Sequence, residues 1–121
     1  MKKSLLALAI AACFTTAAFA DCTYPRAPGK APDGNVATRD EMVAANKAVK
    51  DYNDAMNVYL KCIKDEVDAA LAKDGASLTE DQKRQMAAMY AQKNDSAVDE
   101  LTTVANALNE QIRVFKAKEA K

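Results

Sequence analysis

Two long stretches of the chain repeat apolar residues at helical spacing. In the first stretch the steps between apolar positions alternate between three and four residues, which places these positions on one face of an α-helix. They are Met42, Ala45, Val49, Tyr52, Met56, Tyr59 and Ile63, followed by Val67 and Leu71. The second stretch has a similar series at Met86, Tyr90, Ala97, Val98, Leu101, Val104, Leu108, Ile112 and Phe115. The pattern predicts two helices, over about 38–74 and 79–117.

Each predicted helix begins with a capping box, in which a threonine hydroxyl and a side chain three residues later satisfy each other's free backbone amides. Thr38 and Glu41 form the first box, and Thr79 and Gln82 form the second. At the other end of the first helix we expect Gly75 to stop it in the left-handed conformation that glycine tolerates.

The link between the predicted helices spans only about five residues, 74–78, and short links join antiparallel neighbours. The second helix has a polar gap at 93–95, where it either frays or kinks, or where Asn94 faces a partner. The fold class is therefore predicted as all-α: two long antiparallel helices forming a hairpin over 38–118.

The segment 21–37 differs in composition from the rest, because it holds every proline of the chain and two of its three glycines. Residues that precede proline favour extended geometry, so the segment is predicted to be an extended arm. Sixteen residues separate Cys22 from Thr38 and can span up to about 50 Å, whereas the 24 residues from Thr38 to Cys62 cover about 36 Å of helix. The arm can thus return along the first helix, with Tyr24 and Val36 as expected contacts.

Residues 1–20 have the three parts of a secretory signal: the basic start Met1-Lys2-Lys3, an apolar run over 5–12, and the small residues of Ala18-Phe19-Ala20. We expect cleavage after Ala20 and a periplasmic or secreted location. One alternative stays open, because the residues 10–13 resemble a lipobox. Lipidation of Cys13 would instead anchor the protein to a membrane.

Cleavage after Ala20 leaves 101 residues, enough for one small domain. It removes Lys2 and Lys3, so 15 basic residues face 17 acidic ones, a formal net charge of −2. A chain this close to neutral gives no indication of a nucleic-acid partner.

Two cysteines remain after cleavage, and an even number in an exported chain favours a disulfide. We predict an intrachain Cys22–Cys62 bond that pins the arm to the hairpin. A bond between two protomers is the alternative. A redox or metal-binding thiol pair is disfavoured because the spacing is not C-x-x-C and no histidine is present.

The sequence predicts no catalytic site, no metal site and no cofactor. The lack of histidine removes the usual general base and most transition-metal sites. Carboxylate pairs occur, as at Asp51/Asp54 and Asp99/Glu100, but a two-helix rod has no deep cleft in which they would act across a substrate. We therefore expect a protein that is not an enzyme.

Two resemblances follow from these motifs. The start Cys22-Thr23-Tyr24-Pro25, with the helical stretch as far as Cys62, resembles many small uncharacterised exported proteins of Gram-negative bacteria. Leu78-Thr79-Glu80-Asp81-Gln82 is similar to the LTxxQ motif of Spy/CpxP-type periplasmic proteins. That second resemblance implies a helical, dimeric, chaperone-like stress protein.

Three functions are compatible with these features. The first is a non-enzymatic helical protein that acts through protein–protein contacts, with an unidentified partner and a second copy as one candidate. The second is a Spy/CpxP-like chaperone, whose methionine and tyrosine stripes would provide an adaptable surface, although the same stripes also fit core packing. The third is a lipid-anchored structural protein, which requires lipidation at Cys13.

Overall fold

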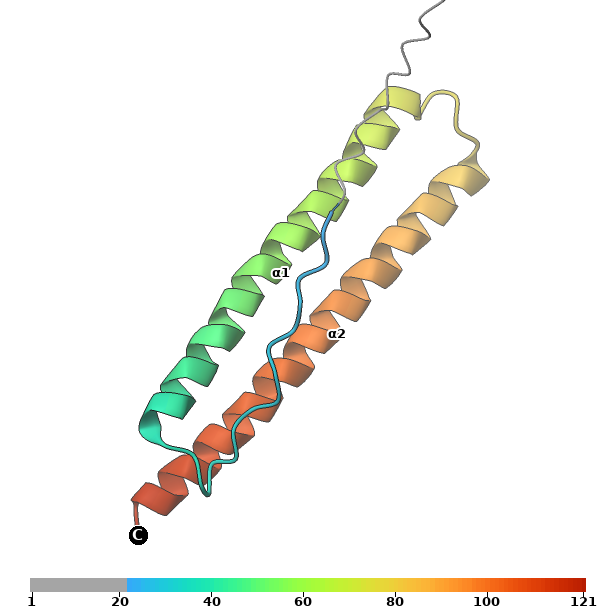
Figure 1. Ribbon diagram of the computed structural model, residues 1–121. Helices are drawn as coiled ribbons and strands as arrows, with labels where there is room; N and C mark the ends of the chain where they lie inside the picture. Colours follow the sequence, from blue (N-terminus) through green and yellow to red (C-terminus); the bar gives the residue numbers. More distant parts are fainter. Residues whose placement is uncertain (1–21) are drawn as a thin grey trace, which may run out of the picture.

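The structure is a computed structural model that describes residues 22–121. It contains two helices, α1 (Arg39–Asp74) and α2 (Glu80–Glu119), which pack antiparallel along their length (Figure 1). No strand occurs in this part of the chain. The predicted all-α hairpin is confirmed, and the second helix continues two residues beyond its predicted end. The residues for which a secretory signal is predicted, including Cys13, Ala18 and Ala20, lie outside the described part.

Both capping boxes are present. The backbone amide of Glu41 donates to the Thr38 hydroxyl at 3.2 Å, and the Thr38 amide donates to the Glu41 carboxylate at 2.7 Å. At α2 the Gln82 amide donates to the Thr79 hydroxyl at 3.2 Å, and the Thr79 amide donates to the Gln82 side chain at 2.8 Å. Each threonine therefore lies just outside its helix, as the N-cap, and the first helical residue follows it.

The end of α1 differs from the expectation. Gly75 has φ −57° and ψ −33°, so it is right-handed rather than left-handed, and its amide donates to the Leu71 carbonyl at 2.9 Å. A Cβ added at this position would collide with that same carbonyl oxygen. The glycine is thus needed for a close backbone approach and not for a left-handed turn.

The core consists of two clusters along the hairpin. The first lies near the disulfide and contains Tyr52, Met56, Tyr59, Ile63 and Ala97. The second lies near the open end of the hairpin and contains Ala37, Met42, Leu108 and Phe115. The predicted stripes supply eight of these nine residues, so the core follows the apolar pattern of the helices.

One member of the second stripe was predicted wrongly. Val98 is 43% exposed, because it follows Ala97 directly and the helix turns by about 100° between neighbouring residues. At the polar gap α2 runs unbroken through residues 93–95, and Asn94 is half-buried. The gap therefore interrupts the apolar face but not the helix.

The arm runs back between α1 and α2, over one face of the hairpin (Figure 1). Ala27 packs against the first core cluster and Ala31 against the second. The expected contact at Val36 is wrong, since Val36 is 78% exposed and its neighbour Ala37 is buried instead. The arm is thus a third layer over one face of the hairpin.

Within residues 22–121, neither helix combines the length and the apolarity that crossing a membrane requires.

Candidate functional site

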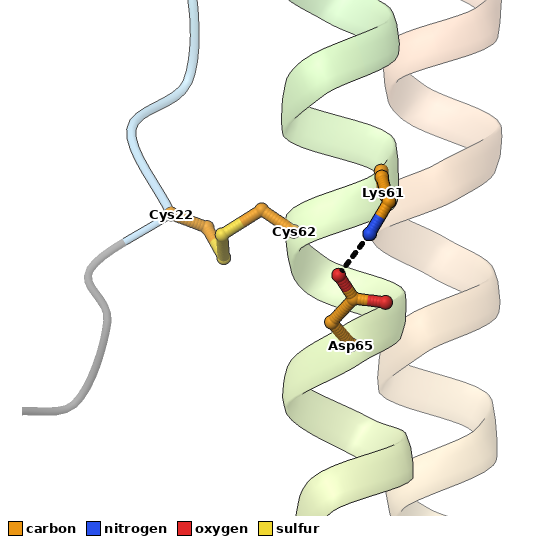
Figure 2. The surroundings of a disulfide bond; sticks show 4 residues. All are labelled: Cys22, Lys61, Cys62 and Asp65. Atoms are coloured by element: carbon orange, nitrogen blue, oxygen red, sulfur yellow. Dashed lines mark hydrogen bonds and ion pairs between the residues drawn. A yellow bond between two sulfur atoms is a disulfide. The ribbon is translucent and has the colours of Figure 1, made fainter.

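The arm is fixed to the hairpin by the predicted disulfide. Cys22 and Cys62 are bonded, with their Cα atoms 5.7 Å apart (Figure 2). Cys62 lies on α1 beside Lys61, which forms an ion pair with Asp65 on the neighbouring exposed surface. The intrachain pairing is therefore confirmed, and the described chain begins at this covalent junction.

A cluster of aromatic side chains adjoins the disulfide. The rings of Tyr24, from the arm, and Tyr59, from α1, meet edge to face with centroids 4.9 Å apart. The Tyr24 hydroxyl donates to the Glu100 carboxylate of α2 at 2.7 Å. The buried hydroxyl of Tyr52 has no hydrogen-bond partner among the described residues. Tyr24 thus joins the arm to both helices, as the sequence predicted for its contact with the first.

These tyrosines are not bases or nucleophiles at neutral pH. Burial, followed by the hydrogen bond to Glu100, raises the pKa of Tyr24 far above its ordinary value. Burial and the nearby Glu100 carboxylate also raise the pKa of Tyr52. Because both phenols stay protonated, the cluster supports packing and hydrogen bonding rather than acid–base chemistry.

Replacing Tyr52 and Tyr24 by phenylalanine, one at a time, should change the stability differently. Tyr52→Phe removes a buried hydroxyl that lacks a partner, so the free energy of unfolding should stay the same or rise. Tyr24→Phe removes a hydrogen bond to a carboxylate in a half-exposed setting and should lower it by about 1 kcal/mol. Urea denaturation of both variants measures the difference, and a Tyr52→Phe variant less stable than Tyr24→Phe would contradict the assignment.

The raised pKa values of Tyr24 and Tyr52 also predict a loss of stability in alkali. In the unfolded chain tyrosines lose their protons near pH 10, whereas the folded protein holds these two protons to higher pH. The stabilisation is complete below about pH 10 and is lost as the pH rises above it. Denaturation curves between pH 8 and 11.5 should show a smaller alkaline decline for the double variant Tyr24→Phe/Tyr52→Phe than for the unmodified protein. Equal declines for the two proteins would contradict the assignment of the alkaline loss of stability to Tyr24 and Tyr52.

The other end of the arm is held by contacts that the sequence did not predict. The Gly34 amide donates to the Gln111 side chain of α2 at 2.9 Å, and Lys118 donates to the Ala37 carbonyl at 2.9 Å. The Lys118 ammonium also lies 4.7 Å from the centre of the Phe115 ring. In the sequence Gln111 and Lys118 are ordinary polar helix residues, and no spacing marks them as arm contacts.

Gly34→Ala should loosen this end of the arm. A Cβ at this position would collide with the Gln111 carbonyl oxygen and would lie 2.7 Å from the Phe115 amide nitrogen. We expect a loss of about 1–3 kcal/mol in the free energy of unfolding, as for other overpacked sites. Gly29→Ala is the matched control, because a Cβ there meets nothing within 4 Å. Thermal denaturation compares the two, and equal melting temperatures would show that the turn does not pack as described.

The two cysteines and a nearby carboxylate do not form a metal site. Sulfur atoms of Cys22 and Cys62 and a carboxylate oxygen of Glu66 lie within 4.8 Å of one another. Both sulfurs are bonded to each other, so they are not the thiolates that bind metal ions. Among these three residues only Glu66 retains an anionic donor.

The part of the hairpin nearest the loop between the helices lacks buried residues. Every residue from Lys64 to Ser96 is exposed or half-buried, although this part of the hairpin still carries the apolar stripes. The arm, as far as it is described, starts at Cys22 and runs the opposite way (Figure 1). We call this part, residues 64–96, the loop-end third. Its apolar side chains lie in contact with solvent.

Several of these side chains line a groove on the loop-end third. It is formed by both helices and has a volume of about 150 Å³. Its lining residues are Ile63, Glu66, Val67, Met86, Met89, Tyr90 and Lys93. Met89 is 59% exposed and Leu71, on the neighbouring turn of α1, is 38% exposed. The loop-end groove is therefore an apolar surface with one acidic and one basic residue at its edge.

The methionines and tyrosines of the two stripes divide between core and surface. Met42, Tyr52, Met56 and Tyr59 of α1 are buried, which confirms core packing for that helix. Met86 and Tyr90 of α2 are half-buried and Met89 is exposed, all three at the loop-end groove. Core packing is thus confirmed for α1, whereas the adaptable surface expected of these side chains stays a prediction for α2.

Two further hollows lie along the rest of the hairpin. One, of about 460 Å³, lies between residues 28–31 of the arm and the alanine-rich faces of both helices. The other, of about 510 Å³, lies near Val49 and Leu101 and includes the polar residues Asn46, Lys50, Asn53 and Asn106. Neither contains a buried charged residue, since none is present among the described residues.

Comparison with protein-family models, with curated proteins and with solved structures finds no match for this chain. Its function is therefore inferred from the structure of the site.

Proposed function

We propose that this is an exported, non-enzymatic helical protein that acts through protein–protein contacts made by the loop-end groove. One observation carries the proposal: the hairpin buries its apolar stripes beside the arm but leaves them half-buried or exposed over the loop-end third. Exposed apolar surface rimmed by charged residues is typical of surfaces that bind other proteins. Methionine and tyrosine side chains, which line this groove, adapt readily to a partner.

The disulfide supports export. Cys22–Cys62 is stable in an oxidising compartment and would be reduced in the cytosol. We therefore propose that the signal is cleaved after Ala20 and that the mature protein is periplasmic or secreted. The mass of the exported protein distinguishes this from lipidation at Cys13, which would retain residues 13–20 and add acyl chains.

The proposal is tested by cross-linking in the envelope of cells that express the protein, followed by identification of the cross-linked proteins. Three versions are compared: the unmodified chain, Met89→Asp in the loop-end groove, and Val58→Asp. Val58 is 70% exposed and lies outside the groove, so it controls for the added charge. We expect the unmodified chain and Val58→Asp to share partners that Met89→Asp loses. An identical set of partners for all three would contradict the proposal.

A chaperone of the Spy/CpxP kind is the second candidate, because Met86, Met89 and Tyr90 of the groove follow the Leu78–Gln82 motif on the same helix. In the structure Thr79 and Gln82 of that motif form the capping box. A chaperone should suppress the aggregation of a reduced test protein at stoichiometric amounts, and Met89→Asp should weaken the suppression. Aggregation at the rate of the buffer control would rule this candidate out.

A further inference from the structure

The loop-end groove continues the surface on which the arm is packed. Glu66 at its edge is one helical turn from Cys62, which holds the arm, and lies beside the disulfide. Lys93, at the other edge, lies two turns from Glu100, which accepts the hydrogen bond from Tyr24 of the arm. The groove and the arm therefore share one face of the hairpin. On this face the arm covers the two core clusters, and the described arm leaves the loop-end third open.

The two charged residues of the groove have opposite signs and lie on different helices. Glu66 belongs to α1 and Lys93 to α2. Neither takes part in any of the ion pairs found among residues 22–121, all of which join residues three or four apart on one helix. The groove thus presents an apolar floor between an acidic edge and a basic edge.

We propose that the loop-end groove binds a second copy of this chain, related by a twofold axis parallel to the helices. This inference rests on the proposed function and names its partner. A twofold axis in that direction places α1 of one copy opposite α2 of the other. This orientation turns the acidic edge of each groove, with Glu66, toward the basic edge of the other, with Lys93. The twofold axis then repeats that pairing of opposite charges on both sides of the contact. An axis perpendicular to the helices would place α1 opposite α1, and the opposite charges would not meet.

The expected dimer has a small interface and forms reversibly. From Lys64 to Asp74, α1 offers about 16 Å of helix. A contact this short belongs to the class of interfaces that bury less than about 1,200 Å² in total, which is typical of transient association. The arms occupy the same face beyond Cys22, so the two hairpins must diverge there. Dimerisation should therefore depend on protein concentration.

The test uses charge reversal in the mature, oxidised chain, with mass measured by light scattering over a range of concentrations. Glu66→Lys and Lys93→Glu each create two like-charge contacts in the proposed dimer, so each variant alone should have its dissociation constant raised about tenfold or more. An equimolar mixture of the two variants should recover the dimer, because both contacts then join opposite charges. Lys50→Glu, on the opposite face, is the matched control and should dimerise normally. Circular dichroism confirms that all variants remain helical.

Each outcome decides the proposal. Recovery of the dimer only in the mixture supports the second copy and its orientation. A monomeric unmodified chain, or variants that dimerise alone as well as mixed, would overturn it. If the unmodified chain is monomeric but Met89→Asp still loses envelope partners, the proposed function stands and only this inference fails.

Discussion

Removing the disulfide, by Cys22→Ser/Cys62→Ser, should lower the free energy of unfolding by about 4 kcal/mol. The two cysteines are separated by 40 residues, and closing a loop of that length restricts the unfolded chain by about this amount in the chain-entropy model. For a domain of this size the melting temperature should fall by roughly 20 °C. Thermal and urea denaturation, followed by circular dichroism, measure both quantities.

We expect this loss of stability to come mainly from release of the arm. Ala27 packs on the first core cluster and Tyr24 packs on Tyr59, so release of Cys22 frees one end of the layer that covers this part of the hairpin. Reduction of the unmodified protein should reproduce the effect of the double variant, and a reductant should not change the variant further. A loss of less than about 1 kcal/mol would show that the helices are stable without the arm.

Met56→Ala should lower the free energy of unfolding by about 2–5 kcal/mol, the range for large-to-small changes in a core. Met56 is the largest fully buried side chain among the described residues, with no exposed surface, and lies in the cluster with Tyr52 and Tyr59. The thin core has little material that could fill the space left by the shortened side chain.

Val58→Ala is the control for this prediction. It also shortens an apolar side chain of α1, but Val58 is 70% exposed, so its effect should stay within about 0.5 kcal/mol. Urea denaturation of the two variants side by side gives the comparison. Equal effects would mean that the first core cluster does not hold the helices together.

Periodicity and caps were enough to predict the two helices, because both act through residues close in sequence. The two capping boxes predicted the starts of α1 and α2 to within one residue, and the spacing of apolar residues from Met42 to Ile63 predicted the buried face of α1. The disulfide was predicted from the expected export of the chain and from the even number of cysteines left after cleavage. The arm's return path was predicted from that bond and from the arm's length, which is sufficient to reach Cys62.

Contacts between distant parts of the chain could not be predicted in the same way. Gln111 and Lys118 bind the arm from α2, 77 and 81 residues away in sequence, and nothing local distinguishes them from solvent-facing residues. The burial of Ala37 instead of Val36 depends on the turn at Asp33, whose carbonyl accepts from the amides of both residues. The exposure of the loop-end third could not be predicted from the sequence, because it depends on where the arm lies on the hairpin.

The role of the loop-end groove is tested most directly by photo-cross-linking in living cells from a reactive residue placed at position 89 or, in a separate strain, at position 58. Both positions are exposed on a helix, but only position 89 lines the loop-end groove. We expect cross-links to protein from position 89, to a second copy or to another envelope protein, and none from position 58. Absence of cross-links at position 89, or equal cross-linking at both positions, would contradict a binding role for the groove.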